Sequence, residues 1–386
     1  MTNTDNDTLP KAILYSWPTS VWSTVPQLCL HEKGYSSDEY IIKYVDISEC
    51  FLAMTRRDNT NTDAVAHSQR RSKFMGLAHE VGGCADDSCK NFAPSYLKLR
   101  ADPLAGTIPT LVVPTLETTG NDVDTRYRSL RDTISICDFL DHARSASSGH
   151  IQHSDKPAPT LAPATIEGKG LSDEIINIIH VYTVDPNFVV LAARDEAELR
   201  EKAKRPPGQS LALRREALQR YLEEARQAVA ESAVAPKEGS LTWEQKTVKF
   251  LEEKVQSNEQ IWELYNGKAG KEKEAQFFEV CKRTWTESLP DAFKKLENLF
   301  KGPFALGDQV SLADLHTISW LTRLVSIAGG EPVAAGIDSL IPHLGGYKFG
   351  PKVRKFWEEW VERDSFKNVL VPACGAFRNQ GVQDAK

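Results

Sequence analysis

The chain has 386 residues and a formal net charge of −6 at pH 7, with 41% hydrophobic and 26% charged residues. This length suggests two or three domains, and the composition is that of an ordinary globular protein. The negative net charge gives no electrostatic reason to expect a nucleic-acid partner. The N-terminus shows no signal-peptide pattern, and the apolar run around 189–193 is too short to cross a bilayer. We therefore expect no membrane association.

The cysteines indicate a reducing compartment. There are seven, an odd number, and Cys29, Cys137 and Cys281 fall within apolar or helical patterns, where a free cysteine behaves as a small hydrophobic residue. This is not a disulfide framework, so we expect a cytoplasmic protein. Cys84 and Cys89 lie near acidic residues and histidines, but no second cysteine or histidine pair follows at a usable spacing. We expect no metal site.

In the first part of the chain, short apolar or β-branched runs predict strands at 11–15, 40–45 and 110–113. Helical patterns cover 23–32, closed by Gly34, and 133–142. Residues 51–95 show no sustained period and indicate an insertion, partly helical around 68–79. The order strand, helix, strand, strand, helix, with Pro109 opening the third strand, is the thioredoxin-like plan.

The second half of the chain has helical periodicity almost throughout. Residues 143–170, rich in Ser, Gly, Pro and His, predict a linker. The helices that we expect after it cover 173–194 with a break at Asp185–Pro186, then 194–205, 211–230, 243–265, 273–300, 311–328 and 353–363. The predicted organisation is a domain over 1–142, the linker, and an all-helical domain over 171–386 with extra helices at about 195–275.

Four separated segments carry a family resemblance. They are the stretch from Ser20 to Gly34, fourteen residues later, then Gly106–Leu111 (GTIPTL), Ser129–Leu140 (SLRDTISICDFL) and Phe304–Asp314 (FALGDQVSLAD). Each resembles a feature of glutathione transferases. The first has the spacing that locates the activating residue of that family. The other three resemble, in order, the family motifs G-x-V-P-x-L, L-x-E-S-x-A-I-x-x-Y-L and L-x-G-D-x-x-S-x-A-D. The resemblance covers roughly 11–50, 96–142 and 290–328. It extends to enlarged fungal-type members and, in part, to the β-etherase-related serine classes.

The resemblance implies a thioredoxin-like N-terminal domain followed by an enlarged helical C-terminal domain, with glutathione as co-substrate. Ser20 would donate a hydrogen bond to the glutathione thiolate. Pro26 is best tolerated in the first turn of a helix, which moves the expected helix start toward Ser23. Ser23 therefore competes with Ser20 for the activating role. A serine forms no mixed disulfide, so thiol–disulfide exchange is disfavoured.

The same resemblance assigns residues to the rest of glutathione. Asp132 would pair with the γ-glutamyl ammonium, and Thr133 would bind its carboxylate. Thr107, Ile108 and Pro109 would face the cysteinyl part. If the Ile108–Pro109 bond is cis, the Ile108 backbone turns outward to pair with an extended peptide; a trans bond at a strand start is the alternative. Asp132 and Thr133 could instead serve only as a helix cap.

An aromatic pocket for the second substrate is expected between the domains. Trp22 projects from the turn of Ser20, and His180, Tyr182 and Phe188 are expected on the first long helix opposite it. Packing between the domains is the alternative role for these residues.

The implied activity is attack of glutathione on an electrophilic apolar or aromatic molecule, as in detoxification, by a homodimeric enzyme. Cleavage of β-aryl ethers is a variant of that chemistry. A non-catalytic binding or scaffold protein, with the two insertions as partner surfaces, is the alternative.

Overall fold

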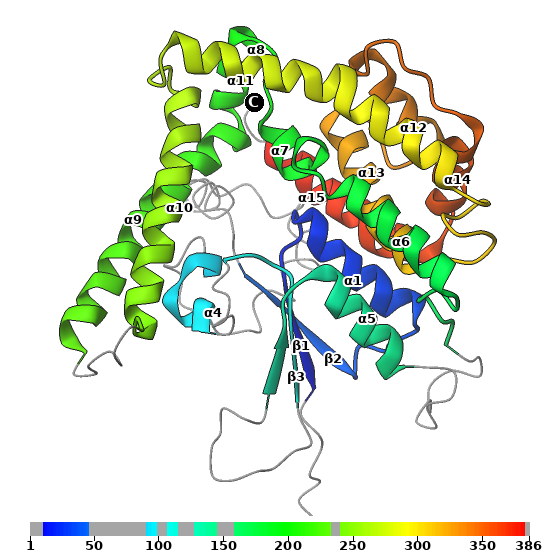
Figure 1. Ribbon diagram of the computed structural model, residues 1–386, viewed down its shortest axis with the longest axis horizontal. Coiled ribbons are helices and arrows are strands. Elements are labelled where there is room, and N and C mark those ends of the chain that lie inside the picture. Colours follow the sequence, from blue (N-terminus) through cyan, green and yellow to red (C-terminus); the bar gives the residue numbers. More distant parts are fainter. Residues whose placement is uncertain are drawn as a thin grey trace, which may run out of the picture.

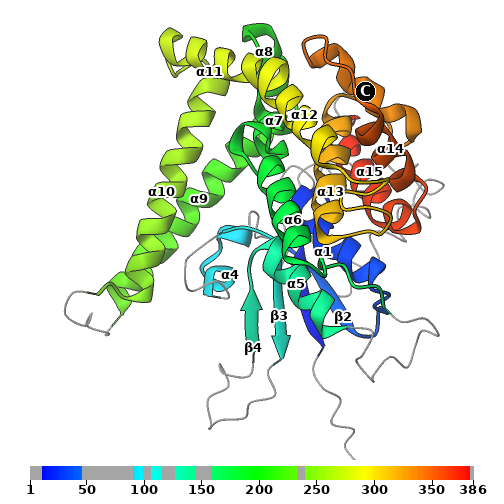
Figure 2. The same cartoon turned by 45° about the vertical axis from the view of Figure 1, so that its right-hand side comes forward.

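The computed structural model describes residues 11–45, 90–98, 106–114, 127–144, 158–232 and 240–382. A small sheet lies at one end of the molecule, with helices stacked beside and above it (Figure 1). A long helical hairpin extends along the other side, as Figure 2 also shows.

The sheet has four strands in the order β2-β1-β3-β4. They are β1 (Ala12–Ser16), β2 (Tyr40–Tyr44), β3 (Thr110–Pro114) and β4 (Tyr127–Leu130). β1 is parallel to β2, and β3 is antiparallel to both β1 and β4. This domain is thioredoxin-like, as predicted. The sequence pattern did not reveal β4, because this four-residue edge strand has one buried residue, Leu130, and therefore no apolar alternation.

The two faces of the sheet are covered by different segments. α1 (Val21–Glu32) and α5 (Thr133–Ala143) share one core with Leu14 of β1. Successive side chains of a strand point to opposite faces. Tyr15 accordingly meets Tyr96 of α4 (Pro94–Lys98) on the other face, with ring centroids 5.8 Å apart. η1 (Lys90–Phe92) precedes α4, and the rest of the predicted insertion lies outside the described residues.

The start of α1 differs from the prediction. The helix begins at Val21, with Ser20 as its N-cap residue, and Pro26 lies inside it. The proline removes the N–H that would bond the carbonyl of Trp22. The helix tolerates this loss because Val25, Leu28 and Cys29 anchor it in the core.

The helical part of the chain begins earlier than expected. α6 (Ile166–Ile179) starts inside the predicted linker, because the Thr165 side chain accepts a hydrogen bond from the Gly168 N–H and caps it. The break predicted at Asp185–Pro186 in the helix over 173–194 is confirmed, but the chain leaves the helix earlier than predicted. α6 ends before His180, a 3₁₀ turn η3 (Tyr182–Val184) follows, and α7 (Pro186–Leu191) begins after its cap residue Asp185.

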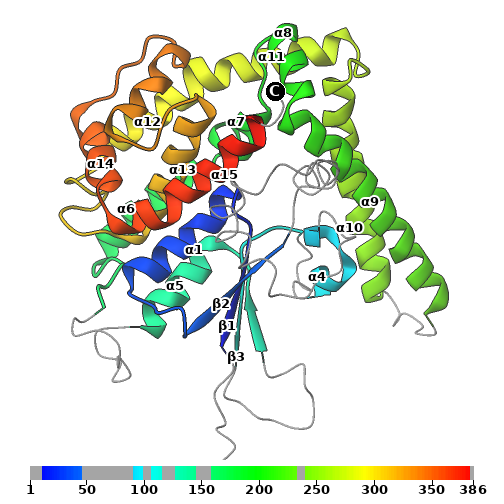
Figure 3. The ribbon, with the colours of Figure 1, turned by 180° about the vertical axis from the view of Figure 1, so that it is seen from behind.

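The centre of the helical domain is α13 (Leu312–Ile327), which is buried on nearly every side. It contacts α1, α6 and α7. The helices and turns packed around it are α12 (Leu289–Leu299), η5 (Ala334–His343), α14 (Pro351–Val361), η6 (Phe366–Leu370) and α15 (Val371–Val382). α15 was not predicted. It crosses the back of the molecule close to α1 (Figure 3).

The extra helices form a projecting arm. They are α8 (Glu196–Lys204), α9 (Pro206–Glu231), α10 (Trp243–Tyr265) and α11 (Lys271–Arg283). α9 and α10 pair as a hairpin, and their Leu218 and Leu251 pack on Phe92 and Leu97 of the N-terminal domain. α11 continues through a π-helical turn, η4 (Thr284–Ser288), into α12. The helix predicted over 273–300 is therefore confirmed in extent, with a π-helical turn just before Pro290.

A buried ion pair holds the segment that connects the two domains against the N-terminal domain. Lys33 Nζ lies 2.7 Å from Asp141 Oδ1 and donates to the Pro159 carbonyl at 2.6 Å. Asp141 also accepts hydrogen bonds from the backbone N–H groups of Leu161 and Ala162. The carboxylate thus joins α1 and α5 to the segment that leads into α6.

Within the described ranges, no helix has both the length and the apolar character needed to span a membrane.

Candidate functional site

Strand register brings three of the predicted segments to one end of the sheet. Tyr15, near the end of β1, pairs with Thr110 at the start of β3. Leu111 of β3 pairs with Leu130 at the end of β4. The turn after β1, the residues before β3 and the residues after β4 therefore leave the sheet at the same end. These are the segments of Ser20, of Ile108–Pro109 and of Asp132–Thr133.

The two candidate serines differ in access. Ser23 is fully buried, whereas Ser20 is half-buried at the N-terminal end of α1. The Ser23 hydroxyl donates to the Ser20 Oγ at 3.0 Å. Among the described residues, the Ser20 side chain makes no capping hydrogen bond to the helix that follows it. Ser20 thus accepts a hydrogen bond from Ser23 and keeps its own proton for a further acceptor.

The loop before β3 is held from behind by the segment that contains α4. The Asn91 side chain donates to the Gly106 carbonyl at 2.8 Å, and the Tyr96 hydroxyl donates to the Thr107 carbonyl at 3.1 Å. Thr107 is exposed, Ile108 is half-buried, and the Ile108–Pro109 bond is cis. Part of the predicted insertion therefore supports a predicted glutathione-binding loop.

Gly106 is a position where any side chain would collide. A Cβ built there would lie 2.5 Å from Cδ1 of the Phe92 ring, which is itself packed in the core under the arm. We expect Gly106→Ala to lower the free energy of unfolding by about 1–3 kcal/mol. The matched control is Gly170→Ala within α6, where nothing lies within 4 Å. This change should stabilise the protein by about 0.5–1 kcal/mol. Urea denaturation measures both, and equal effects at the two sites would contradict the prediction.

Asp132 acts as a helix cap, which was the alternative to a binding role. Its Oδ1 accepts from the Ser135 N–H at 2.8 Å. The side chain is nevertheless exposed, while Thr133, the first residue of α5, is buried. Capping with one oxygen leaves the geometry compatible with binding a cation through Oδ2.

The four residues expected to line one aromatic pocket fall into two separate pairs. Trp22 stacks on His180 with ring centroids 3.9 Å apart, and its indole N–H donates to Asp185 Oδ2 at 3.1 Å. Tyr182 packs on Phe188 at 4.7 Å. Phe188 is only 9% exposed, in a cluster with Cys281, while Tyr182 is 67% exposed. The prediction that His180, Tyr182 and Phe188 lie on one helix facing Trp22 is therefore wrong, because the chain bends between α6 and α7.

A second histidine, His316, was not predicted as a site residue and lies beside His180 and Trp22 where the two domains meet. His180 Nε2 lies 3.2 Å from Nδ1 of His316, which is fully buried in α13. Burial lowers the pKa of His180 to about 4 and that of His316 to about 3. Both rings are therefore neutral at neutral pH. A histidine inside the apolar run of α13 was the available sequence signal for this pair.

The histidine pair predicts loss of stability in mild acid. The folded pKa of His316, about 3, lies below its ordinary value of 6.5. The unfolded chain therefore binds more protons between these values, so the stabilisation is complete above about pH 6.5 and is lost as the pH falls. When the pH falls from about 7 to about 5, the titration of His316 alone should lower the free energy of unfolding by about 2 kcal/mol.

Melting curves of the wild type and His316→Gln at both pH values test this expectation. Burial raises the pKa of Asp314 to about 6, so its protonation in acid stabilises the folded protein. This effect is opposite to that of His316. Because it is present in both proteins, it cancels when their acid shifts are compared. The variant should show a clearly smaller acid shift of Tm. An equal shift in the two proteins would mean that His316 is not the group that titrates.

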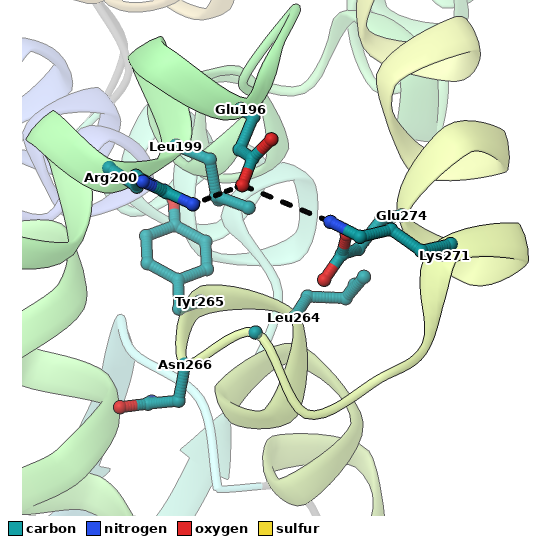
Figure 4. A pocket seen from close by; sticks show the side chains of 9 residues that line it. Glu196, Leu199, Arg200, Leu264, Tyr265, Asn266, Lys271 and Glu274 are labelled. Atoms are coloured by element: carbon teal, nitrogen blue, oxygen red, sulfur yellow. Dashed lines mark hydrogen bonds and ion pairs between the residues drawn. The ribbon is translucent and has the colours of Figure 1, made fainter.

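A charged cavity of about 310 Å³ opens at the base of the arm, between α8 and the loop from α10 to α11 (Figure 4). Glu196 lies between Arg200 and Lys271, and Lys271 also pairs with Glu274 at 3.1 Å. The charged side chains of this cavity thus pair with one another, and none of the predicted site residues lines it.

Over the described ranges, no group of three or more His, Cys, Asp or Glu side chains is arranged to hold a metal ion. Cys84 and Cys89 lie outside those ranges.

No family model matches the chain, and no curated protein matches it. Solved structures similar to it include the β-etherase LigF from Sphingobium sp. strain SYK-6, at 12% identity over 94% of this chain and 99% of that chain, with a TM-score of 0.47. Glutathione transferase F7 from Populus trichocarpa has 13% identity over 94% and 99%, with a TM-score of 0.37. Maleyl pyruvate isomerase, a bacterial transferase of the Zeta class, has 13% identity over 94% and 97%, with a TM-score of 0.38.

Likeness at this level carries no argument about the reaction. The thioredoxin-like assignment rests on the strand order and pairing of the chain itself.

Proposed function

We propose that the protein is a glutathione transferase in which Ser20 stabilises the glutathione thiolate. The observation that carries this proposal is the convergence of Ser20, the Ile108–Pro109 segment and Asp132 at one end of the sheet. Each lies in a motif that resembles a glutathione-binding element, and the three are far apart in the sequence. A chance resemblance in separate segments has no reason to converge in space.

The chemistry needs only a donor and a favourable potential. The thiol of free glutathione has a pKa of about 8.5, so little thiolate exists at neutral pH. A hydrogen bond to a charged group contributes about 1.5–3 kcal/mol, and a helix N-terminus about 0.3–1 kcal/mol. Together they would lower the thiol pKa by roughly 1.5–3 units. Ser20 stands at the start of α1 with its proton available, whereas buried Ser23 supports it from behind.

The remaining contacts follow the extended shape of the tripeptide. The outward backbone of Ile108 would pair with the cysteinyl part, flanked by Thr107 and Pro109. Asp132 Oδ2 would take the γ-glutamyl ammonium, and Thr133 with the first N–H groups of α5 would take its carboxylate. The electrophile would approach along the half-buried side of Trp22 and His180. An aryl ether could be cleaved by the same thiolate, with aryloxide as the leaving group.

A purely scaffolding role is less well supported. That hypothesis uses the two insertions as partner surfaces. The apolar side of the arm, including Leu218 and Leu251, is instead covered by Phe92 and Leu97 of the same chain. The residues of the proposed thiol site, by contrast, are at least partly accessible at Ser20, Thr107 and Asp132.

The test is the ultraviolet absorbance of the thiolate of glutathione bound to the wild-type protein, titrated over pH. We expect the bound thiol to ionise roughly 1.5–3 units below free glutathione. Consumption of a model aromatic electrophile should follow the same ionisation. Absence of binding, or binding with the pKa of the free thiol, would overturn the proposed function.

A further inference from the structure

A buried arginine lies directly behind the turn that carries Ser20. Arg323 belongs to α13, the central helix of the C-terminal domain, and is 8% exposed. Its Nη1 donates to the carbonyl oxygen of Thr19 at 2.8 Å, across 304 residues of sequence. Thr19 immediately precedes Ser20. The helical domain therefore holds the end of the proposed catalytic turn through one charged hydrogen bond.

Arg323 has no carboxylate partner within the described part of the chain. Its guanidinium carbon also lies 4.2 Å from the centroid of the Phe377 ring of α15. Burial lowers the pKa of Arg323 to about 10, so the side chain still carries its charge at neutral pH. A buried charge that is not paired costs free energy. An anion that arrives nearby would offset part of that cost.

The space beside the guanidinium is too small for an organic anion. A cavity of about 10 Å³ lies between α1, α13 and α15 and is lined by Arg323, Thr24, Ser319 and Thr322, among others. This volume has room for about one water molecule. Thr322 Oγ1 is buried there without a hydrogen-bond partner among the described residues. An organic anion that offsets this charge would bind on the accessible side of the turn, where Ser20 is half-buried.

We propose that Arg323 is a positioning residue of the thiol site, which fixes the Thr19–Ser20 turn and whose charge favours the thiolate form of glutathione. This inference rests on the proposed function. The charge acts through protein and not through solvent, so it is weakly screened. Arg323 thus adds to the hydroxyl of Ser20 and the N-terminus of α1. It also makes thiol activation depend on correct docking of α13 and α15 against the N-terminal domain.

The experiment compares Arg323→Gln, which keeps a donor for the Thr19 carbonyl but loses the charge, with Arg323→Lys, which keeps the charge. Arg354→Gln is the control for loss of one positive charge, since Arg354 lies on α14 and pairs with Asp338. The pKa of bound glutathione is measured from thiolate absorbance in one buffer of constant ionic strength for all variants, so that screening by salt is the same throughout.

We expect Arg323→Gln to raise the bound thiol pKa by about one unit. At about pH 6 the thiolate fraction, and with it kcat/KM, should fall by about three- to tenfold, depending on where the wild-type pKa lies between about 5.5 and 7. Arg323→Lys should stay within a few tenths of a unit of the wild type, and Arg354→Gln should leave the pKa unchanged. A wild-type pKa in Arg323→Gln overturns the inference. So does an equal rise in the Gln and Lys variants, because the charge would then have no role.

If Arg323→Gln does not fold, Arg323→Lys still decides, because a raised thiol pKa in that variant contradicts the inference. The two proposals fail differently. If wild-type protein leaves the thiol pKa of glutathione unchanged, the proposed function fails. If the wild type lowers it and Arg323→Gln lowers it equally, only the role of Arg323 is wrong.

Discussion

Replacing Ser20 with alanine is expected to lower kcat/KM for glutathione conjugation by roughly 10- to 100-fold near neutral pH. The change removes the half-buried hydroxyl of the N-cap residue of α1. A donor to a charged acceptor contributes about 1.5–3 kcal/mol, which corresponds to this range. The pKa of the bound thiol should rise by about one to two units. Stopped-flow or steady-state assays over pH, together with thiolate absorbance, measure both quantities.

Ser23→Ala is the matched control for this prediction. Ser23 is fully buried and donates to Ser20 Oγ at 3.0 Å, so its loss should weaken the site only indirectly. We expect kcat/KM to change by no more than about fivefold. The lost hydrogen bond is a neutral one to Ser20, and Ser23 itself does not contact the sulfur in the proposed site. If Ser23→Ala lowered kcat/KM more than Ser20→Ala did, Ser23 and not Ser20 would be the residue that activates the thiol.

Asp141→Ala is expected to lower the free energy of unfolding by about 3–5 kcal/mol, the largest stability effect that we foresee. The change leaves the Lys33 ammonium, whose side chain has no exposed surface, without its counter-ion. It also removes the acceptor of the Leu161 and Ala162 N–H groups. Urea denaturation, followed by tryptophan fluorescence, gives the change in midpoint.

The control for Asp141→Ala is the double variant Lys33→Met/Asp141→Asn, which removes both charges and keeps an amide oxygen as acceptor. We expect it to be more stable than the single variant, because the cost arises chiefly from one unpaired buried charge. Asp173→Ala, which breaks the exposed pair with Lys169, should change the stability by less than about 1 kcal/mol. A single variant as stable as the double variant would show that Lys33 is not buried as described.

The sequence suggests the candidate thiol site because the parts of that site are local motifs. A turn before an amphipathic helix, a proline at a strand start and an acid–hydroxyl pair before a second helix each lie within a few consecutive residues. The choice between Ser20 and Ser23 could not be made in this way. Pro26 suggested a later helix start, but the packing of α1 in the core sustains a helix that begins at Val21.

Two buried residues that contact the surroundings of the candidate site could not be located from the sequence. His316 and Arg323 are two turns apart on α13, a helix whose pattern predicts only burial. Their partners, His180 and the Thr19 carbonyl, come from the residue that follows α6 and from the turn after β1. Asp185 appeared in the sequence as the site of a helix break, and its bond to the Trp22 indole depends on how the domains meet.

Local sequence determined most of the elements, because strands β1 to β3 and helices such as α10 and α13 are set by short-range apolar periodicity and capping. It also determined the thioredoxin-like order of the N-terminal domain. Only the tertiary structure decided where α6 ends, that the arm covers part of its own N-terminal domain, and which buried charges find partners. These outcomes depend on contacts between residues distant in sequence, and the free energy of burying an apolar or charged side chain is set by those contacts and not by its neighbours along the chain.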